Sequence, residues 1–335
     1  MSMQQAQRRE ELGERIAAIS RWGFIQPYVC RVLPEAPGPS RAPDNFQALV
    51  VQNDGTGPAT VEYRLADSTR LFAKLYADES GAHAYEVLHN LWCGGFDRRQ
   101  CYQVPEPLCF VAEYQLLLMR EARGETLASY LNQDGGKAVT GVREAARWLL
   151  RLHSSPLRMG KVDQPWYMFL KLSDRLAKAA SSHPQELKNL TAMLVRLGEL
   201  AERREQGEVV QAHGQFRPIH VFLSGETVTA IDVDRSVPAD PAKDLAEFVH
   251  RLRSTILRGS GSMRRTNLLT RTFLDEYAAR EPSRLSTLSF YQGFHILVSL
   301  CRHLKQLKAD DPAWEPTMDF YVGEFETAMS GEFDG

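Results

Sequence analysis

The sequence predicts an α+β fold with two lobes, a strand-rich N-terminal lobe and a mainly helical C-terminal lobe. Between residues 45 and 122, short runs of alternating apolar and polar residues are separated by turn signals, which is typical of an antiparallel meander. From residue 123 onward, apolar residues recur almost everywhere at helical spacing. Strands followed by helices are the signature of the α+β class. The 335 residues, 43% of them apolar, are enough to bury a sizeable core.

Residues 1–44 are interpreted as an N-terminal helix and a linker. One amphipathic helix is expected over residues 1–25, with Leu12, Ile16 and Ile19 on its apolar face. Residues 34–44 are rich in Pro and Ala and predict a surface loop.

Residues 45–122 are predicted to form the first lobe. The turn residues between its first strands, which include Asp-Gly and Gly-Pro pairs, favour antiparallel pairing. A helix with one apolar face follows the third strand. The expected elements are strands at 46–51, 60–65, 71–76, 109–111 and 115–119 and a helix at 80–92.

Residues 123–335 are predicted to form a helical lobe, interrupted by a loop and a hairpin at 212–235. The hairpin has strands at 221–223 and 228–231 around the turn Ser224-Gly225-Glu226. The helices of this lobe are expected at 125–131, 142–152, 165–180, 186–205, 242–257, 266–279, 284–306 and 314–330.

Composition indicates a cytoplasmic protein. A formal net charge of −2 provides no field that would favour nucleic acid or an acidic membrane surface. The 5 cysteines are scattered and lack CxxC spacing, which fits reduced thiols. No apolar run approaches the roughly 18 residues of a membrane span, and the N-terminus has no signal-peptide pattern. We therefore expect neither nucleic acid nor a membrane among the partners.

A pair of carboxylates is the most specific chemical signal in the chain. Asp232 and Asp234 follow an apolar strand and precede Asp-Pro-Ala-Lys-Asp-Leu. Magnesium prefers hard oxygen ligands, usually one or two carboxylates together with phosphate oxygens and water. The two residues can share one metal, or one can bind metal while Arg235 pairs with the other. The alternative is an ordinary acidic pair on the surface.

Lys74 lies inside the third strand, in Phe-Ala-Lys-Leu-Tyr. An ammonium within an apolar strand is unfavourable unless it reaches a partner. The alternative is an exposed lysine on an edge strand.

The segment from residue 212 to residue 245 resembles the aminoglycoside phosphotransferase and choline kinase family, a branch of the protein-kinase-like fold. That family has His-Gly-Asp, four residues and Asn, then a hairpin, then Ile-Asp-Phe/Trp-Asp or Glu and Asp-Pro-x-x-Asp-Leu. The resemblance spans about residues 45–255 and implies a protein-kinase-like two-lobe fold that uses ATP (or GTP) and Mg²⁺. The matching positions are His213, Gly214, Asp232, Asp234, Asp240, Pro241, Asp244 and Leu245.

The resemblance also implies a nucleotide site in the first lobe. Lys74 would contact the α- and β-phosphates and pair with Glu86 from the following helix. Met119 and Glu121 would belong to the hinge that binds the adenine edge. The turn at residues 53–57 would cover the phosphates, or it is a plain hairpin turn.

In the second lobe, the resemblance implies that Asp232 and Asp234 bind the metal and that Asp244 braces the catalytic loop. Two loop positions depart from the family, because its catalytic Asp is Gln215 and its metal-binding Asn is His220. Gln215 is a very poor base, although its amide can orient a hydroxyl. An imidazole at 220 suits zinc, copper or iron better than magnesium, or it donates to a phosphate oxygen.

Arg217 adds a cation to the same loop, where a phosphate or an anionic substrate could pair with it. We therefore predict phosphoryl transfer from ATP to a hydroxyl of an unidentified small molecule, slowed by the missing base. Loss of a general base typically costs about 10²–10⁴-fold in rate.

The alternative function is that of a pseudokinase, which binds nucleotide or a protein partner and regulates without turnover. One basic stretch raises the hypothesis of a phosphorylated or acidic partner, although such stretches are usually solvated helix faces. It consists of Arg251, Arg253, Arg258, Arg264 and Arg265.

Overall fold

The computed structural model describes residues 3–33, 46–53, 58–65, 69–133, 135–203, 208–307 and 311–331. The predicted loop at 34–44, residues 54–57 of the predicted phosphate-covering turn and the turn at 66–68 lie outside these residues. The chain divides into two compact units. The first unit comprises Met1–Gly124 and Ser224–Asp234, and the second comprises Glu125–Leu223 and Arg235–Gly335.

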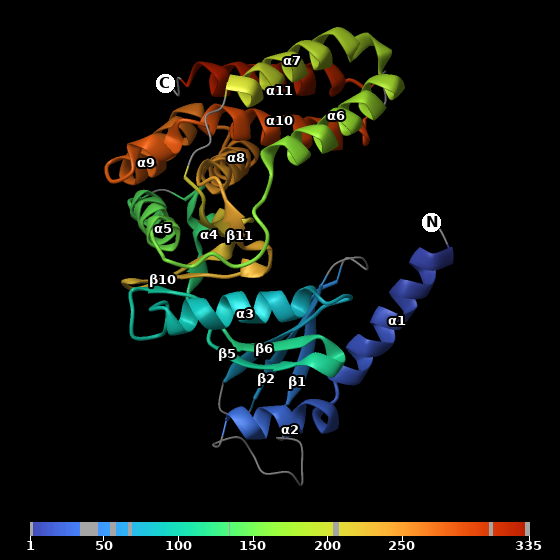
Figure 1. Cartoon of the computed structure of the whole chain (residues 1–335), viewed down its shortest axis with the longest axis vertical. Helices are drawn as coiled ribbons and strands as arrows, with labels where there is room; N and C mark the ends of the chain where they lie inside the picture. The colour runs from blue at the N-terminus through green and yellow to red at the C-terminus, as the bar shows by residue number, and fades with distance from the viewer. Residues whose placement is uncertain are drawn as a thin grey trace. The chain divides into compact units, whose positions relative to one another are not determined.

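A five-stranded antiparallel sheet with the order β1-β2-β3-β6-β5 forms the centre of the first unit (Figure 1). The predicted meander of the first three strands is confirmed. The elements of this unit are α1 (Met3–Ile19), α2 (Trp22–Val32), β1 (Gln47–Gln52), β2 (Ala59–Arg64), β3 (Arg70–Leu75), α3 (Ser80–Cys93), β4 (Tyr102–Gln103), β5 (Pro107–Val111), β6 (Leu116–Arg120) and β10 (Thr227–Ala230).

Helices α1 and α2 share a buried core with the sheet. Val61, Ala73 and Leu118 are neighbours in the sheet register and therefore lie on one face, because paired residues on adjacent strands point the same way. These three residues join Ile19 and Ile25 of the helices in one hydrophobic cluster. The two helices thus bury the apolar half of the strand alternation.

The prediction of a single helix over residues 1–25 is wrong. The first helix ends at Ile19, and the second begins at Trp22. Side chains satisfy the carbonyls at the break, since Ser20 Oγ donates to the Ile16 carbonyl and Tyr63 Oη to the Ile19 carbonyl, both at 2.8 Å. Helix ends need such partners for their last carbonyls. Tyr63 comes from β2, so this termination depends on a tertiary contact.

The opposite face of the sheet carries the other half of the alternation. Lys74 pairs with Leu117 and Phe72 pairs with Met119, so these four side chains share that face. Helix α3 packs against β5 and β6. The strand register therefore places Lys74 and Met119 on the same surface.

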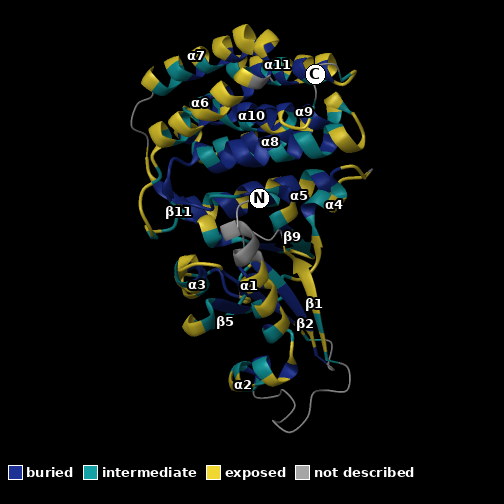
Figure 2. Ribbon diagram, turned by 90° about the vertical axis from the view of Figure 1, so that its right-hand side faces the viewer, coloured by how far each residue is buried: buried dark blue, intermediate teal, exposed yellow. Residues whose placement is uncertain are grey.

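The second unit is mainly helical, as predicted. Helices α8 and α10 are largely buried, whereas α6 and α7 carry many exposed residues (Figure 2). The elements of this unit are β7 (Glu125–Thr126), α4 (Leu127–Tyr130), α5 (Lys137–His153), α6 (Pro165–Ser182), α7 (Leu187–Arg203), β8 (Val210–Ala212), β9 (Val221–Ser224), β11 (Val237–Ala239), α8 (Ala242–Gly259), α9 (Met263–Ala278), α10 (Leu288–Leu304) and α11 (Trp314–Ser330).

Short strands account for the main differences from the expected elements here. The helix predicted over 125–131 begins instead with the two-residue strand β7, which pairs with β9 through Glu125↔Leu223 and Thr126↔Phe222. Strands β8 and β11 pair with each other and were not predicted. Strands of two or three residues are too short to show a period of two. Within the described residues, no helix combines the length and the apolar character of a membrane span.

Tyr63→Phe tests the bond between the sheet and the end of α1. We expect the free energy of unfolding to fall by about 1–2 kcal/mol, because the buried Ile19 carbonyl loses its donor. Tyr167→Phe is the matched control, because that tyrosine is 57% exposed. Urea unfolding followed by circular dichroism measures both variants. Equal stability of Tyr63→Phe and the wild type would show that this bond does not hold the helix end.

Candidate functional site

Lys74 is the buried cation of the first unit. It lies near the end of β3, and its side chain is only 9% exposed. Its Nζ lies 2.5 Å from Asp232 Oδ1 and 2.5 Å from Asp234 Oδ2. One ammonium is thus held by two carboxylates that are distant in the sequence. The sequence placed all three residues in one site, and the structure brings them together.

The path of the chain after β10 aims both carboxylates at Lys74. Strand β10 pairs in parallel with β4 through Val228↔Tyr102, which attaches this segment to the first unit. Asp232 has a φ of 70°. Aspartate is one of the few residues other than glycine that adopt this left-handed conformation with some frequency. The turn it makes allows Asp232 and Asp234 to reach the same ammonium.

The charges of this triad do not balance. Burial lowers the pKa of Lys74, but the charges of Asp234 and Asp232 outweigh that effect and raise it. Burial raises the pKa of Asp234, Lys74 opposes the change, and Asp232 adds to it, so the pKa of Asp234 remains raised. Two carboxylates that share one ammonium carry an excess of negative charge. The oxygens of Asp232 and Asp234 are the groups of this triad that could hold a further cation.

Oxygen atoms dominate the donor set around Lys74. The Tyr76 hydroxyl is buried and makes no hydrogen bond of normal geometry within the described residues. Burial first, and then the charge of Asp234, raise the pKa of Tyr76. Carboxylate and hydroxyl oxygens fit Mg²⁺, which needs only one or two protein carboxylates when phosphates supply the rest. No described group of three or more His, Cys, Asp or Glu residues could hold a metal ion by itself.

Glu86 does not take the place predicted for it. It is exposed on α3, and among the described residues the ion pairs of Lys74 are those with the two aspartates. Met119 is partly buried and shares the sheet face of Lys74. Glu121 follows β6 and pairs with Arg70 at 2.7 Å. Because Lys74 pairs with the two aspartates, Glu86 does not make the predicted ion pair with Lys74.

The loop that begins at His213 belongs to the second unit and is held by Asp244. The backbone N–H groups of His213 and Gly214 donate to the two oxygens of this fully buried carboxylate at 2.5 and 2.8 Å. His153 Nε2 lies 3.1 Å from Asp244 Oδ2, and its Nδ1 lies 2.7 Å from the Tyr277 hydroxyl. The predicted bracing role of Asp244 matches these contacts.

Gly214 is required by the backbone of this loop. Its φ is +80°, and a Cβ at this position would lie 2.1 Å from the Arg235 carbonyl oxygen. No side chain fits at that distance. The backbone at Gly214 therefore lies too close to the Arg235 carbonyl for any residue that has a side chain.

His220 and Gln215 contact each other across the loop. His220 Nδ1 lies 2.9 Å from the Gln215 carbonyl oxygen. A carbonyl only accepts, so Nδ1 must carry the proton. In the neutral ring, Nε2 is then the nitrogen that can accept a proton or bind a metal. The bond fixes the tautomer of the residue that replaces the family's Asn.

Arg217 donates through Nε to Glu247 Oε1 at 2.7 Å. Glu247 also receives Arg251 Nε at 3.0 Å and His295 Nδ1 at 2.9 Å. Burial raises the pKa of Glu247, but His295, Arg217 and Arg251 together hold it well below its usual range. Sequence reasoning missed Glu247 and His295. The only local signal was the i,i+4 spacing of Glu247 and Arg251.

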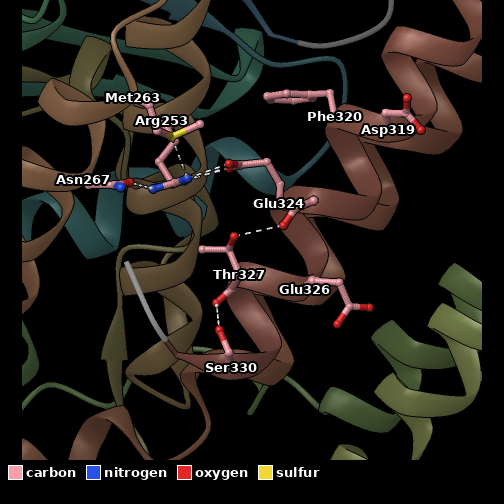
Figure 3. A pocket seen from close by; sticks show the side chains of 10 residues that line it. Arg253, Met263, Asn267, Asp319, Phe320, Glu324, Glu326, Thr327 and Ser330 are labelled. Carbon is pink, nitrogen blue, oxygen red and sulfur yellow. Dashed lines mark hydrogen bonds and ion pairs between the residues drawn. The ribbon is translucent and has the colours of Figure 1, made fainter. Parts of the chain in front are cut away.

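The basic stretch proposed as a partner site does not form one surface, which is a correction. Arg253 is buried and forms a bidentate pair with Glu324 at 2.7 and 2.5 Å, and it donates to Asn267 at 2.9 Å (Figure 3). It lines an open groove of about 610 Å³ between α8, α9 and α11. Arg265 donates to the backbone carbonyls of residues 131 and 133. Internal contacts thus occupy Arg253 and Arg265.

A strand-rich unit that carries a buried lysine–aspartate site, together with a helical unit that carries a braced His-Gly loop, defines a protein-kinase-like molecule. The family model described as "Phosphotransferase enzyme family" matches residues 53–282, more than half of the 335 residues. The chain therefore belongs to the phosphotransferase enzyme family. No curated protein matches the sequence.

Solved structures of aminoglycoside phosphotransferases and choline kinases share the fold. An aminoglycoside phosphotransferase from Alicyclobacillus acidocaldarius has a TM-score of 0.58 at 15% identity, covering 88% of this chain and 96% of that one. Aminoglycoside phosphotransferase APH(4)-Ia, in complex with AMP-PNP and hygromycin B, gives 0.58 at 11% identity, covering 91% and 97%. A choline/ethanolamine kinase family protein from Mesorhizobium loti gives 0.55 at 14%, covering 92% and 94%. At these identities the similarity establishes the fold.

Asp244→Asn tests the brace of the loop. The pKa of Asp244 is lowered in the folded protein. The stability that its carboxylate contributes is therefore present above the ordinary pKa of 3.8 and is lost as the pH falls through the pKa of the folded state. We expect the variant to lose about 3 kcal/mol of stability near neutral pH, because the amide cannot serve both N–H donors and His153.

The measurement is urea unfolding at about pH 7, 5 and 3. The difference between the variant and the wild type should shrink at the lowest pH. Asp174→Asn, at a position whose side chain is 62% exposed, is the control and should change little. A difference independent of pH would contradict the assignment of the charge to Asp244.

Proposed function

We propose that the protein transfers a phosphoryl group from ATP or GTP to a hydroxyl of a small molecule. The single observation that carries the proposal is the buried ammonium of Lys74 between Asp232 and Asp234. A lysine that contacts phosphates and carboxylates that hold the metal are the groups that kinases use for a metal–triphosphate complex. Family membership supports the same reaction class.

In this proposal Lys74 would bind the α- and β-phosphates, and Asp232 and Asp234 would hold the Mg²⁺. The bound Mg²⁺ would neutralise charge that develops on the phosphates during transfer. Met119, on the same sheet face as Lys74, would contact the purine, and the backbone up to Glu121 would bind the adenine edge.

The loop of the second unit would handle the acceptor. Gln215 stands where the family has its catalytic aspartate, and its amide can orient a hydroxyl but cannot take the proton at neutral pH. His220 would contribute a polar ring nitrogen in place of the family's Asn. Because the transition state of phosphoryl transfer is loose, positioning and charge neutralisation can support a slow reaction without a base.

The second candidate function is that of a pseudokinase with a regulatory role. The observation that favours it is that both loop positions handling the proton and the metal are replaced, by Gln215 and His220. Arg217 also donates its Nε to Glu247, so this atom is not turned toward solvent. In this case nucleotide would still bind at Lys74, but no phosphate would be transferred.

Nucleotide binding tests the role of the Lys74 triad. We expect calorimetry with AMP-PNP and Mg²⁺ to show binding by the wild type and a loss of at least about tenfold in Lys74→Ala and Asp232→Ala, since each removes a charge-assisted contact. Related structures contain AMP-PNP, which makes it a suitable probe. Lys188→Ala, at an exposed position of α7, is the control. Equal affinity in all four proteins would refute the nucleotide site.

Gln215→Asp separates the slow enzyme from the pseudokinase. If the rest of the site is competent, a carboxylate at this position should raise the rate of phosphoryl transfer by about 10²–10⁴-fold. The assay follows ADP release with a pool of hydroxyl acceptors, and Gln215→Asn is the matched control. If the wild type transfers phosphate and Lys74→Ala does not, the pseudokinase function is excluded. No transfer by either protein, with nucleotide bound, would instead favour it.

A further inference from the structure

Tyr76 lies beside the triad of Lys74, Asp232 and Asp234 and belongs to the same unit. It follows the end of β3, two residues after Lys74, and this spacing puts both side chains on one face of an extended chain. The ammonium of Lys74 lies 5.9 Å from the centroid of the Tyr76 ring. The ring therefore lines the place where the ammonium and the carboxylates meet.

The hydroxyl of Tyr76 faces Asp234. Burial, and after it the charges of Asp234 and Asp232, raises the pKa of Tyr76. Burial also raises the pKa of Asp234, and the Tyr76 hydroxyl is among the groups that oppose this rise, after Lys74. Each of the two side chains thus acts on the charge of the other, which places the hydroxyl next to the carboxylate.

This hydroxyl makes no hydrogen bond of normal geometry within the described residues, although Tyr76 is only 1% exposed. Asp234 instead directs Oδ2 to the ammonium of Lys74, at 2.5 Å. A buried donor without an acceptor is unfavourable, because it has lost its water and gained no partner. The carboxylate of Asp234 is an acceptor beside it, and a hydroxyl that donates to a carboxylate makes one of the stronger hydrogen bonds.

The ring and the backbone of Tyr76 are held by neighbouring elements of the unit. The Tyr76 N–H donates to the Gln115 carbonyl at 3.0 Å, just before β6. The ring packs against the first turn of α3, where a Cβ on Gly81 would lie 2.8 Å from Tyr76 Cδ2. These contacts fix the direction in which the hydroxyl points.

Helix α1 provides a further contact to Tyr76 through Arg15. Nη2 of Arg15 donates to the Tyr76 carbonyl at 2.9 Å and to the Tyr114 carbonyl at 2.7 Å. One guanidinium thus joins the end of β3 to the turn before β6. Because the family match covers residues 53–282, Arg15 lies outside the matched part of the chain.

We infer that Tyr76 is a positioning residue for the metal site, whose hydroxyl donates to Asp234 and orients that carboxylate toward the divalent ion, and that Arg15 of α1 holds Tyr76 in place. This inference rests on the proposed function, in which Asp232 and Asp234 hold Mg²⁺. Carboxylates that bind metals are commonly held by such hydrogen bonds, and losing one typically lowers metal affinity by about 10–100-fold. The N-terminal helix is then part of the phosphotransferase site.

Calorimetry with Mn²⁺ in the presence of AMP-PNP tests the role of the hydroxyl. We expect Tyr76→Phe to bind Mn²⁺ at least about tenfold more weakly than the wild type, because Asp234 loses the donor that orients it. The thermal midpoint of the metal-free variant should not fall, since the ring stays and the lost hydroxyl had no normal hydrogen bond. Tyr85→Phe, at a partly buried position of α3, is the matched control. Unchanged Mn²⁺ affinity, or a loss of affinity together with a lower midpoint, would overturn the inference.

Arg15→Gln tests whether α1 acts through Tyr76. We expect this change to weaken Mn²⁺ binding by about threefold or more in the wild type and to have no further effect in Tyr76→Phe, because both changes act on one hydrogen bond. Arg31→Gln, at an exposed arginine of α2, is the control, and circular dichroism checks that each variant is folded. Equal losses in the two backgrounds would contradict a role of α1 through Tyr76.

Phosphoryl transfer measured in the same proteins keeps the two proposals apart. Mn²⁺ binding that depends on Tyr76, without transfer to any acceptor, would refute the proposed reaction alone. Mn²⁺ binding of equal strength in the wild type and in Tyr76→Phe would refute this inference alone. A wild type that binds no Mn²⁺ would refute both.

Discussion

The buried ion triad of Lys74, Asp232 and Asp234 is the interaction on which the rest of the site depends. It joins a central strand of the first unit to a segment 158 residues further along the chain. An unpaired ammonium could not stay buried in the sheet, so the aspartates are needed for the fold before any ligand binds. In the proposed function, the same two carboxylates would hold the metal.

The loop that begins at His213 matches the family at its first two residues and differs from it at residues 215 and 220. Asp244 holds His213 and Gly214 by their backbone N–H groups, and Gly214 has a conformation that admits no side chain. These features fix where the following residues lie, whatever their identity. Gln215 and His220 then occupy positions that elsewhere in the family handle the proton and the metal. The loop thus combines a braced backbone with a side chain at residue 215 that is not a carboxylate.

Much of the fold could be predicted from the sequence, because it follows from local patterns of apolar and polar residues. Strand alternation predicted the meander, and the resemblance of residues 212–245 to the family led us to expect Lys74, Asp232 and Asp234 in one site. The break between α1 and α2 could not be predicted, since it depends on Tyr63 from a distant strand. The sequence predicted Glu86 as the partner of Lys74. A family pattern states which residues meet, but it does not state whether they meet with or without a ligand. Glu247 and His295 meet only through the packing of α8 on α10.

The measurement that tests the central claim most directly is a crystal structure with AMP-PNP and Mn²⁺, in which anomalous scattering locates the metal. The account predicts a manganese ion bound to Asp232 and Asp234, with Lys74 Nζ moved from the carboxylates to the α- and β-phosphates. A nucleotide bound elsewhere, or a Lys74 that keeps both carboxylates while the metal lies away from them, would contradict it.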